Sequence, residues 1–147
     1  MKDLYLDIDG CLILDDLVNN GKGALRLGLF LTTIGNLQAD GLCKIHWLTT
    51  HCKHGNDTQV LKYLKQRLEP HDFDLIQRMK IQPTTWNELK TEAIDFSMDF
   101  LWLDDEFFPE ELEVLKRHSA ENKFIKIDLQ KNKYQLRDIV YSKILEK

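Results

Sequence analysis

The chain has 147 residues, of which 43% are hydrophobic and 30% are charged, and this is the size and composition of one globular domain with one core. Its formal net charge of −4 gives no support for nonspecific nucleic-acid binding, although a local basic patch is compatible with that charge. No apolar run approaches the roughly 18 residues that span a bilayer, so no membrane partner is expected. The N-terminus lacks a signal-peptide pattern, and three cysteines, an odd number, fit a reducing compartment better than a disulfide framework. A cytoplasmic protein is therefore expected.

Apolar, strand-like runs alternate along the chain with amphipathic helical segments, which predicts an α/β protein with a mainly parallel sheet. The expected elements, in chain order, are strand 3–8, helix 29–40, strand 44–49, helix 56–68, strand 78–81, a helix that starts at the capping-box sequence 85–88, strand 100–103, helix 109–118, strand 124–127 and helix 134–146. These five strands would form one three-layer α/β/α, Rossmann-like domain over residues 1–147. The strand at 78–81 has the weakest signal.

Glycine and proline mark several of the expected boundaries. Gly41 stops the first helix, Pro70 ends the second, and Pro109 suits the first turn of the fourth. Between the first strand and the first helix, the sequence Val18 to Gly23 predicts the turn of a small hairpin flap. No segment has the composition of a flexible linker, so a single domain is expected.

Two carboxylates stand at the end of the first predicted strand. Asp7 and Asp9 are one residue apart and are followed by Gly10, and in a strand such side chains point to the same side of the sheet. Carboxylates this close repel each other, and Mg²⁺, which prefers oxygen ligands, is the natural cation to lie between them. A strand that simply ends in an Asp-Gly turn would have the same sequence, so the motif needs support from the rest of the chain.

Further polar side chains follow the other predicted strands. Parallel strands connected by right-handed crossovers have their carboxyl ends along one edge of the sheet, where ligands bind. Thr49 ends the second strand, and Asp104 and Asp105 end the fourth. Lys90 lies in the first turns of the helix after the third. Four carboxylates on one edge cannot all be ionised without compensation, which a divalent cation and the lysine would supply. Phosphoryl transfer requires such a set, with a carboxylate as nucleophile.

These segments resemble the four motifs of the haloacid dehalogenase-type phosphohydrolases in their order, spacing and placement at strand ends. The segments are Asp7-Ile8-Asp9-Gly10, the strand that ends in Thr49, Lys90, and Trp102-Leu103-Asp104-Asp105-Glu106. The resemblance covers the chain from the first predicted strand through the fourth. The last motif is also similar to that of the small, cap-poor branch found as domains in RNA-repair proteins.

The resemblance implies separate roles for the two early aspartates. Asp7 would attack phosphorus and form an aspartyl-phosphate. Asp9 would protonate the leaving oxygen and then activate water as a general acid/base, while its backbone carbonyl faces the metal. Gly10 would let the chain turn sharply away from the site.

The resemblance also implies which residues bind the phosphate and the metal. Thr49 would hydrogen-bond the phosphoryl group, and Thr50 is a competitor that strand alternation disfavours. Lys90 would neutralise phosphate charge and support the nucleophile. The Mg²⁺ residues implied are Asp7, Asp9, Asp104 and Asp105. Which of the last two binds the metal directly, and which through water, stays open.

Other functions fit the sequence less well. A response-regulator receiver would need its phosphorylated aspartate after the third strand and a Lys-Pro pair after the fifth, where this chain has Gln82-Pro83 and Asp128. A topoisomerase-primase-type domain would need an early strand-end glutamate before a later Asp-x-Asp. The chain lacks the repeated paired spacing that is typical of zinc ligands. The residues that could suggest a zinc site are Cys43, His46, His51, Cys52 and His54, and of these His51 or His54 could contact substrate. The alternative function is a noncatalytic module that binds phosphate and Mg²⁺.

The segments in which this family carries inserted cap domains are short in this chain. About 35 residues separate Gly10 from the second predicted strand and about 40 separate Thr49 from Lys90, too few for a further domain beside the expected elements. The resemblance therefore implies a capless, Mg²⁺-dependent phosphatase with an open site. Such a site suits a phosphate on a nucleic-acid end, a nucleotide or a phosphoprotein, or a small molecule if a second subunit acts as a lid. The acidic charge argues mildly against nucleic acid.

Overall fold

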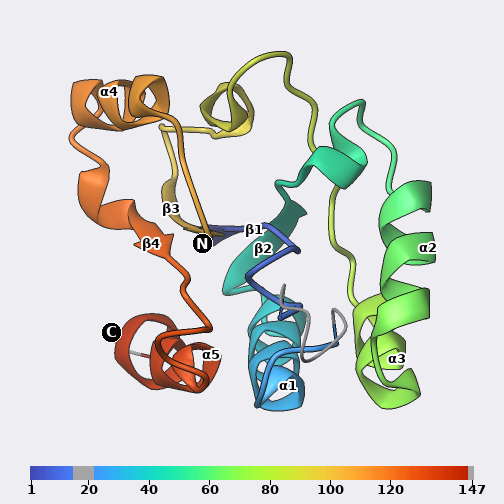
Figure 1. The fold of residues 1–147 in the computed structure, drawn as a ribbon. Coiled ribbons are helices and arrows are strands. Elements are labelled where there is room, and N and C mark those ends of the chain that lie inside the picture. Colours follow the sequence, from blue (N-terminus) through green and yellow to red (C-terminus); the bar gives the residue numbers. More distant parts are fainter. Residues whose placement is uncertain (15–21, 146–147) are drawn as a thin grey trace.

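A computed structural model describes residues 1–14 and 22–145, and within them four parallel strands form one sheet (Figure 1). The strands are β1 (Lys2–Leu6), β2 (Cys43–Trp47), β3 (Asp99–Asp104) and β4 (Phe124–Lys126). Their order across the sheet is β2-β1-β3-β4, and every neighbouring pair is parallel. The predicted α/β class with a parallel sheet is confirmed, and the topology is consistent with a Rossmann-like fold.

The described residues also form five helices and four short helical turns. The helices are α1 (Leu27–Ala39), α2 (Thr58–Arg67), α3 (Pro70–Arg78), α4 (Pro109–Arg117) and α5 (Gln135–Ile139). The turns are η1 (Thr50–Cys52), η2 (Lys90–Ala93), η3 (Glu121–Lys123) and the π-helical η4 (Val140–Ile144). Figure 1 shows α1 and α5 on one side of the sheet, and α4 with the yellow turn η2 on the other. In this part of the chain, no helix combines the length and apolar character that crossing a membrane requires.

The two central strands are buried on both faces. Leu4, Tyr5 and Leu6 of β1 are buried, and so is every residue of β3 after Asp99. Such nearly continuous apolar runs are typical of parallel strands covered by helices on both faces. Because β1 and β3 are neighbours and run in the same direction, the residues that follow them meet at the carboxyl edge of the sheet.

The predicted strand at 78–81 is wrong, and the sheet formed by residues 1–14 and 22–145 has four strands rather than the five expected. Arg78 is the last residue of α3. Gln82 then pairs with β2 as a single bridge, through hydrogen bonds from Trp47 N to Gln82 O (2.8 Å) and from Gln82 N to Ile45 O (2.9 Å). The next acceptor of β2, Trp47 O, accepts from the Thr84 hydroxyl (2.6 Å) instead of a backbone N–H, so the pairing ends after one bridge.

Three of the expected helices differ from the observed ones. The last, expected at 134–146, is an α-helix over Gln135–Ile139 and continues as the π-helical η4. Pro70 does more than end the second predicted helix, because it is the first residue of α3, a position where the missing N–H of proline costs nothing. The capping-box sequence at 85–88 starts no helix. Instead the Glu92 carboxylate accepts hydrogen bonds from the N–H groups of residues 87–89 (2.8–3.1 Å) and closes a turn into η2.

The predicted hairpin flap is described at its base. Ile13 and Gly23 form an antiparallel bridge, with hydrogen bonds of 2.8 Å from Leu14 N to Lys22 O and from Ala24 N to Leu12 O. This pairing fits the base of a hairpin. Most of the predicted turn, residues 18–21, lies outside the described residues.

Replacing Ile34 of α1 by alanine is expected to lower the free energy of unfolding by about 2–5 kcal/mol, because a fully buried side chain would leave a cavity. Urea denaturation measures the loss. Leu29→Ala on the same helix is the control, since Leu29 is 37% exposed and its loss should stay below about 1 kcal/mol. Equal losses for the two variants would contradict this orientation of α1.

Candidate functional site

Two aspartates lie side by side where β1 and β3 end. Asp7 follows β1 and Asp104 is the last residue of β3, and Asp7 N donates to Leu103 O (3.0 Å). Both aspartate side chains are buried, Asp104 completely. The sequence predicted this proximity, because neighbouring parallel strands end at the same edge of a sheet.

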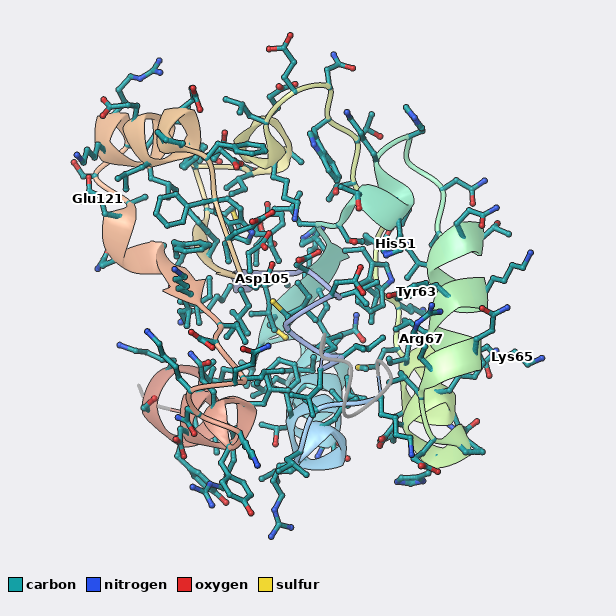
Figure 2. All side chains as sticks on the ribbon, viewed as in Figure 1. His51, Tyr63, Lys65, Arg67, Asp105 and Glu121 are labelled. Atoms are coloured by element: carbon teal, nitrogen blue, oxygen red, sulfur yellow. The ribbon has the colours of Figure 1, made fainter. Side chains whose placement is uncertain are left out.

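Four side chains form a compact group at this edge. Asp7, Cys11, Asp104 and Asp105 each offer one ligand atom, and these atoms all lie within 4.8 Å of one another. The three aspartates are residues that the sequence predicted for a metal site, whereas Cys11 was not predicted. Figure 2 shows Asp105 near the middle of the molecule, at some distance from the side chains labelled along α2.

Lys90 neutralises part of the negative charge of this group. It is the first residue of η2, and its Nζ donates to Asp104 Oδ2 (2.6 Å) and lies 3.5 Å from Asp7 Oδ1. Asp104 Oδ2 also accepts a hydrogen bond from Trp102 Nε1 (3.3 Å), and Asp104 Oδ1 accepts one from Glu106 N (3.3 Å). These three donors fix the orientation of the Asp104 carboxylate.

Burial and neighbouring charges change the acidity of these groups. Burial raises the pKa of Asp7 well above its usual range, the Lys90 ammonium opposes the rise, and Asp104 adds to it. Burial, together with a hydrogen bond and charge repulsion from Asp104, raises the pKa of Asp105 to about 6. Burial acts to lower the pKa of Lys90, but attraction to Asp7 and Asp104 outweighs it and raises that pKa. One lysine therefore leaves part of the carboxylate charge uncompensated.

The group fits a divalent cation that prefers oxygen ligands. Asp7, Asp104 and Asp105 supply hard carboxylate oxygens, which suit Mg²⁺, and a bound cation would offset the charge that Lys90 does not. Burial, followed by the field of the nearby carboxylates, raises the pKa of the Cys11 thiol well above its usual range. Cys11 is thus a neutral thiol rather than the thiolate that binds soft metals. The donor set favours Mg²⁺ over zinc.

Glycine is required at position 10, where the backbone passes close to the Asp105 carboxylate. Its φ of +77° lies in the left-handed region, which side chains disfavour. A Cβ at this position would lie 2.5 Å from Asp105 Oδ2. Any side chain on residue 10 would therefore displace the Asp105 carboxylate.

The Asp9 carboxylate has partners outside this group. β1 ends at Leu6 rather than at the predicted residue 8, so strand alternation does not apply to Asp7 and Asp9. His51 Nε2 lies 2.9 Å from Asp9 Oδ2, and the Tyr63 hydroxyl donates to Asp9 Oδ1. Asp9 is thereby tied to η1 and α2 rather than to the other carboxylates.

The two partners of Asp9 contact each other and a third side chain. The rings of His51 and Tyr63 are 4.1 Å apart between centroids, and the Arg67 guanidinium lies 3.8 Å from the centroid of the Tyr63 ring. Figure 2 shows these three side chains one after another beside α2. Such stacking restricts the motion of His51 and Tyr63 and so fixes the orientation of Asp9.

Thr49 and Thr50 occupy different environments after β2. Thr49 is buried, and its Oγ1 accepts a hydrogen bond from His51 N (3.4 Å), which caps η1. Because the Thr49 hydroxyl is the acceptor in this contact, its O–H group can still donate a hydrogen bond to a ligand. Thr50 is exposed and is the first residue of η1.

Several residues of the site carried little signal in the sequence. Tyr63 and Arg67 are four residues apart, a spacing that places them on one helix face, but Tyr63 is 54 residues from Asp9 and no local pattern links the two. His51 was predicted only as a candidate substrate contact. Cys11 belongs to the flap, where the sequence predicted no functional residue.

No family model, curated protein or solved structure matches the chain.

Without a metal, Asp105→Asn is expected to raise the melting temperature at pH 7.5. The pKa of Asp105 is about 6 in the folded protein and 3.8 when unperturbed. Between these values the folded state binds more protons than the unfolded state, so its stability falls as the pH rises. After allowance for solvent screening, the gain at pH 7.5 is about 1 kcal/mol, or roughly 2–4 °C.

Thermal melts in the presence of a chelator at pH 7.5 and 4.5 test this, and the gain should be smaller at pH 4.5, because only part of the loss of stability between the two pKa values has taken place at that pH. Asp99→Asn is the control. A hydrogen bond from Lys123 lowers the pKa of Asp99, so loss of its charge should destabilise the protein at pH 7.5. A gain for Asp105→Asn that is larger at pH 4.5 would contradict the repulsion described above.

Gly10→Ala is expected to destabilise the protein more than Gly41→Ala. Both glycines have a left-handed φ, +77° and +72°, so each change costs about 1–2 kcal/mol of backbone strain. A Cβ at Gly41 has nothing within 4 Å, whereas a Cβ at Gly10 meets the Asp105 carboxylate. Urea unfolding gives the difference between the two losses. Mg²⁺ should raise the melting temperature of Gly41→Ala as in the wild type and that of Gly10→Ala less, and equal behaviour would count against the close approach to Asp105.

Proposed function

We propose that this protein is a Mg²⁺-dependent phosphatase, which hydrolyses phosphomonoesters through an aspartyl-phosphate on Asp7 as the haloacid dehalogenase-type phosphohydrolases do. One observation carries the proposal. Asp7 lies in a group with Asp104 and Asp105, and the Lys90 ammonium is 3.5 Å from its carboxylate. A nucleophile, ligands for a cation and a fixed positive charge are the parts that phosphoryl transfer needs.

Asp7, Asp104 and Asp105 would hold the Mg²⁺, which when bound supplies positive charge to the phosphoryl oxygens and orients them. The sequence also predicted Asp9 as a Mg²⁺ residue. Because its carboxylate is engaged by His51 and Tyr63, Asp9 would contribute to the Mg²⁺ site through its backbone carbonyl. Lys90 is buried between two carboxylates, so its charge is held at a fixed place and costs no reorganisation during the reaction.

The first step joins Asp7 to the phosphoryl group. A carboxylate oxygen of Asp7 attacks phosphorus, the bond from phosphorus to the ester oxygen breaks, and protonated Asp9 donates its proton to the departing alkoxide. Lys90 offsets the negative charge on the phosphoryl oxygens next to Asp7. The Thr49 hydroxyl, with Thr50 as the second candidate, donates a hydrogen bond to one of them.

The second step releases phosphate. Asp9, now ionised, takes a proton from water, and the oxygen of that water attacks the phosphorus of the aspartyl-phosphate. The bond between phosphorus and Asp7 breaks, which restores both carboxyl groups and releases inorganic phosphate. His51 and Tyr63 support this role of Asp9 because their contacts hold its carboxylate in one orientation during both proton transfers.

The proposed substrates are phosphates presented to an open, capless site, as on a nucleic-acid end, a nucleotide or a phosphoprotein. After the flap, the described residues up to β2 are occupied by α1, and those between β2 and β3 contain η1, α2, α3 and η2. This leaves little chain for a cap. The free thiols of Cys11, Cys43 and Cys52 support action in a reducing compartment such as the cytoplasm.

The proposal predicts Mg²⁺-dependent release of phosphate from an aryl phosphate. Asp7→Asn should lower kcat by at least about 10³-fold, because an amide cannot act as the nucleophile. Removal of Mg²⁺ by a chelator should abolish the activity. Asp99→Asn, at the opposite end of β3, is the control and should retain wild-type activity. A thermal melt of each variant establishes that it is folded.

Equal rates for wild type and Asp7→Asn would refute the assignment of the nucleophile. If Mg²⁺ and a phosphate mimic raise the melting temperature but no substrate is turned over, the protein is instead a noncatalytic binding module.

A further inference from the structure

The Asp9 carboxylate lies where the proposed reaction releases the alcohol of the substrate, because Asp9 gives its proton to the departing oxygen. His51 and Tyr63 contact this carboxylate, yet the Asp9 side chain is 40% exposed, so a substrate can reach it. The leaving group therefore lies beside these two partners, on the side of η1 and α2.

Arg67 lies next to this place. Its guanidinium is 3.8 Å from the centroid of the Tyr63 ring, and the hydroxyl of the same ring donates to Asp9. Figure 2 shows His51, Tyr63 and Arg67 on the side of α2 that faces the rest of the molecule, whereas Lys65 points outward. The Tyr63 side chain thus contacts both the proposed general acid and a cation, which places Arg67 within reach of a group a few bonds from the leaving oxygen.

The positive charge of Arg67 is not neutralised by a described carboxylate. Within residues 1–14 and 22–145, none of the ion pairs includes it, although it is half-buried. α2 adds Lys62 and Lys65 and contains no acidic residue, while the whole chain has a net charge of −4. A positively charged helix therefore lies beside the leaving group in a site that is otherwise rich in carboxylates.

A phosphate is the anion that suits this arrangement. The contact with Tyr63 is made over the central carbon of the guanidinium, so the N–H groups at its rim are able to donate to an anion. Their planar fork matches two oxygens of a phosphate. A phosphate dianion is also attracted more strongly by the three cations of α2 than a singly charged carboxylate is.

We infer that Arg67 binds a second phosphate of the substrate, so that the preferred substrates are bisphosphates whose two phosphates are a few bonds apart. The inference rests on the proposed phosphatase function, which places the first phosphate at Asp7 and its ester oxygen at Asp9. A small diol bisphosphate and the phosphorylated end of a nucleic acid both carry such a second phosphate, and substrates of both kinds distinguish the two sources.

Matched substrates test the inference in the wild type with Mg²⁺. For ethane-1,2-diol or propane-1,3-diol, the kcat/KM of the bisphosphate should exceed that of the monophosphate by about tenfold or more, the effect expected of hydrogen bonds between charged groups. If the source is a nucleic acid, a 5′-phosphorylated dinucleotide should be preferred over both diol bisphosphates. Ratios near one for both diols, and for the dinucleotide against the nucleoside 5′-monophosphate, would overturn the inference.

Variants of α2 assign the ratio to Arg67. Arg67→Met removes the charge but keeps a long stem beside the Tyr63 ring, so the ratio should fall to within about twofold of one, whereas Arg67→Lys should keep part of it. Lys65→Met is the matched control and should leave the ratio unchanged, because Lys65 lies in the same last turn of α2 and points outward. If Arg67 only holds Tyr63 in place, Arg67→Met lowers kcat/KM for both esters alike, and the unchanged ratio would refute the assignment.

A binding measurement separates failure of this inference from failure of the proposed function. Propane-1,3-bisphosphonate and propylphosphonate, which are not hydrolysed, are titrated separately in excess Mg²⁺. The bisphosphonate should raise the melting temperature more than the phosphonate in the wild type but not in Arg67→Met. That difference without turnover of any ester would refute the phosphatase function and support the second phosphate site. Hydrolysis of an aryl phosphate with equal shifts for the two phosphonates would support the phosphatase function and refute the second phosphate site.

Discussion

Repulsion among the carboxylates at the ends of β1 and β3 is the constraint on which the rest of the site depends. Asp104 is completely buried, and removing a carboxylate from water costs several kcal/mol unless a partner compensates. Lys90 supplies that partner at 2.6 Å. It does so from a turn that the Glu92 carboxylate holds closed through three backbone N–H groups. The irregular segment between α3 and β3 therefore places one ammonium group at the carboxyl edge of the sheet.

The two aspartates of the opening motif lie in different environments, and this difference is the basis for giving them different chemistry. Asp7 faces an ammonium group and other carboxylates, which suits a nucleophile next to a cation. Asp9 faces an imidazole and a phenol hydroxyl, groups that can share and orient a proton. Separation of roles by environment is a general means by which two carboxyl groups in one site act as nucleophile and as acid/base.

Much of the fold and of the carboxylate group could be predicted from the sequence, because both follow from short-range patterns. Apolar runs of strand length predicted the four strands that form the sheet, and parallel strands bring their carboxyl ends together. The strand at 78–81 failed because α3 continues to Arg78 and only Gln82 then pairs with β2, as a single bridge. The partnership of Asp9 with Tyr63 could not be predicted, since it depends on how α2 packs beside the site.

Gln82 covers the outer edge of β2 with a single residue. It uses Trp47 N and Ile45 O, and the next residue is a proline, so a strand from another molecule finds neither a free run of backbone groups nor a donor to continue the ladder. At the opposite edge, β4 has three residues, too few to template a long pairing. Neither edge of the sheet therefore offers a template on which a further strand could pair. A second subunit that covers the carboxyl edge of the sheet must therefore bind through helices and loops rather than by adding a strand.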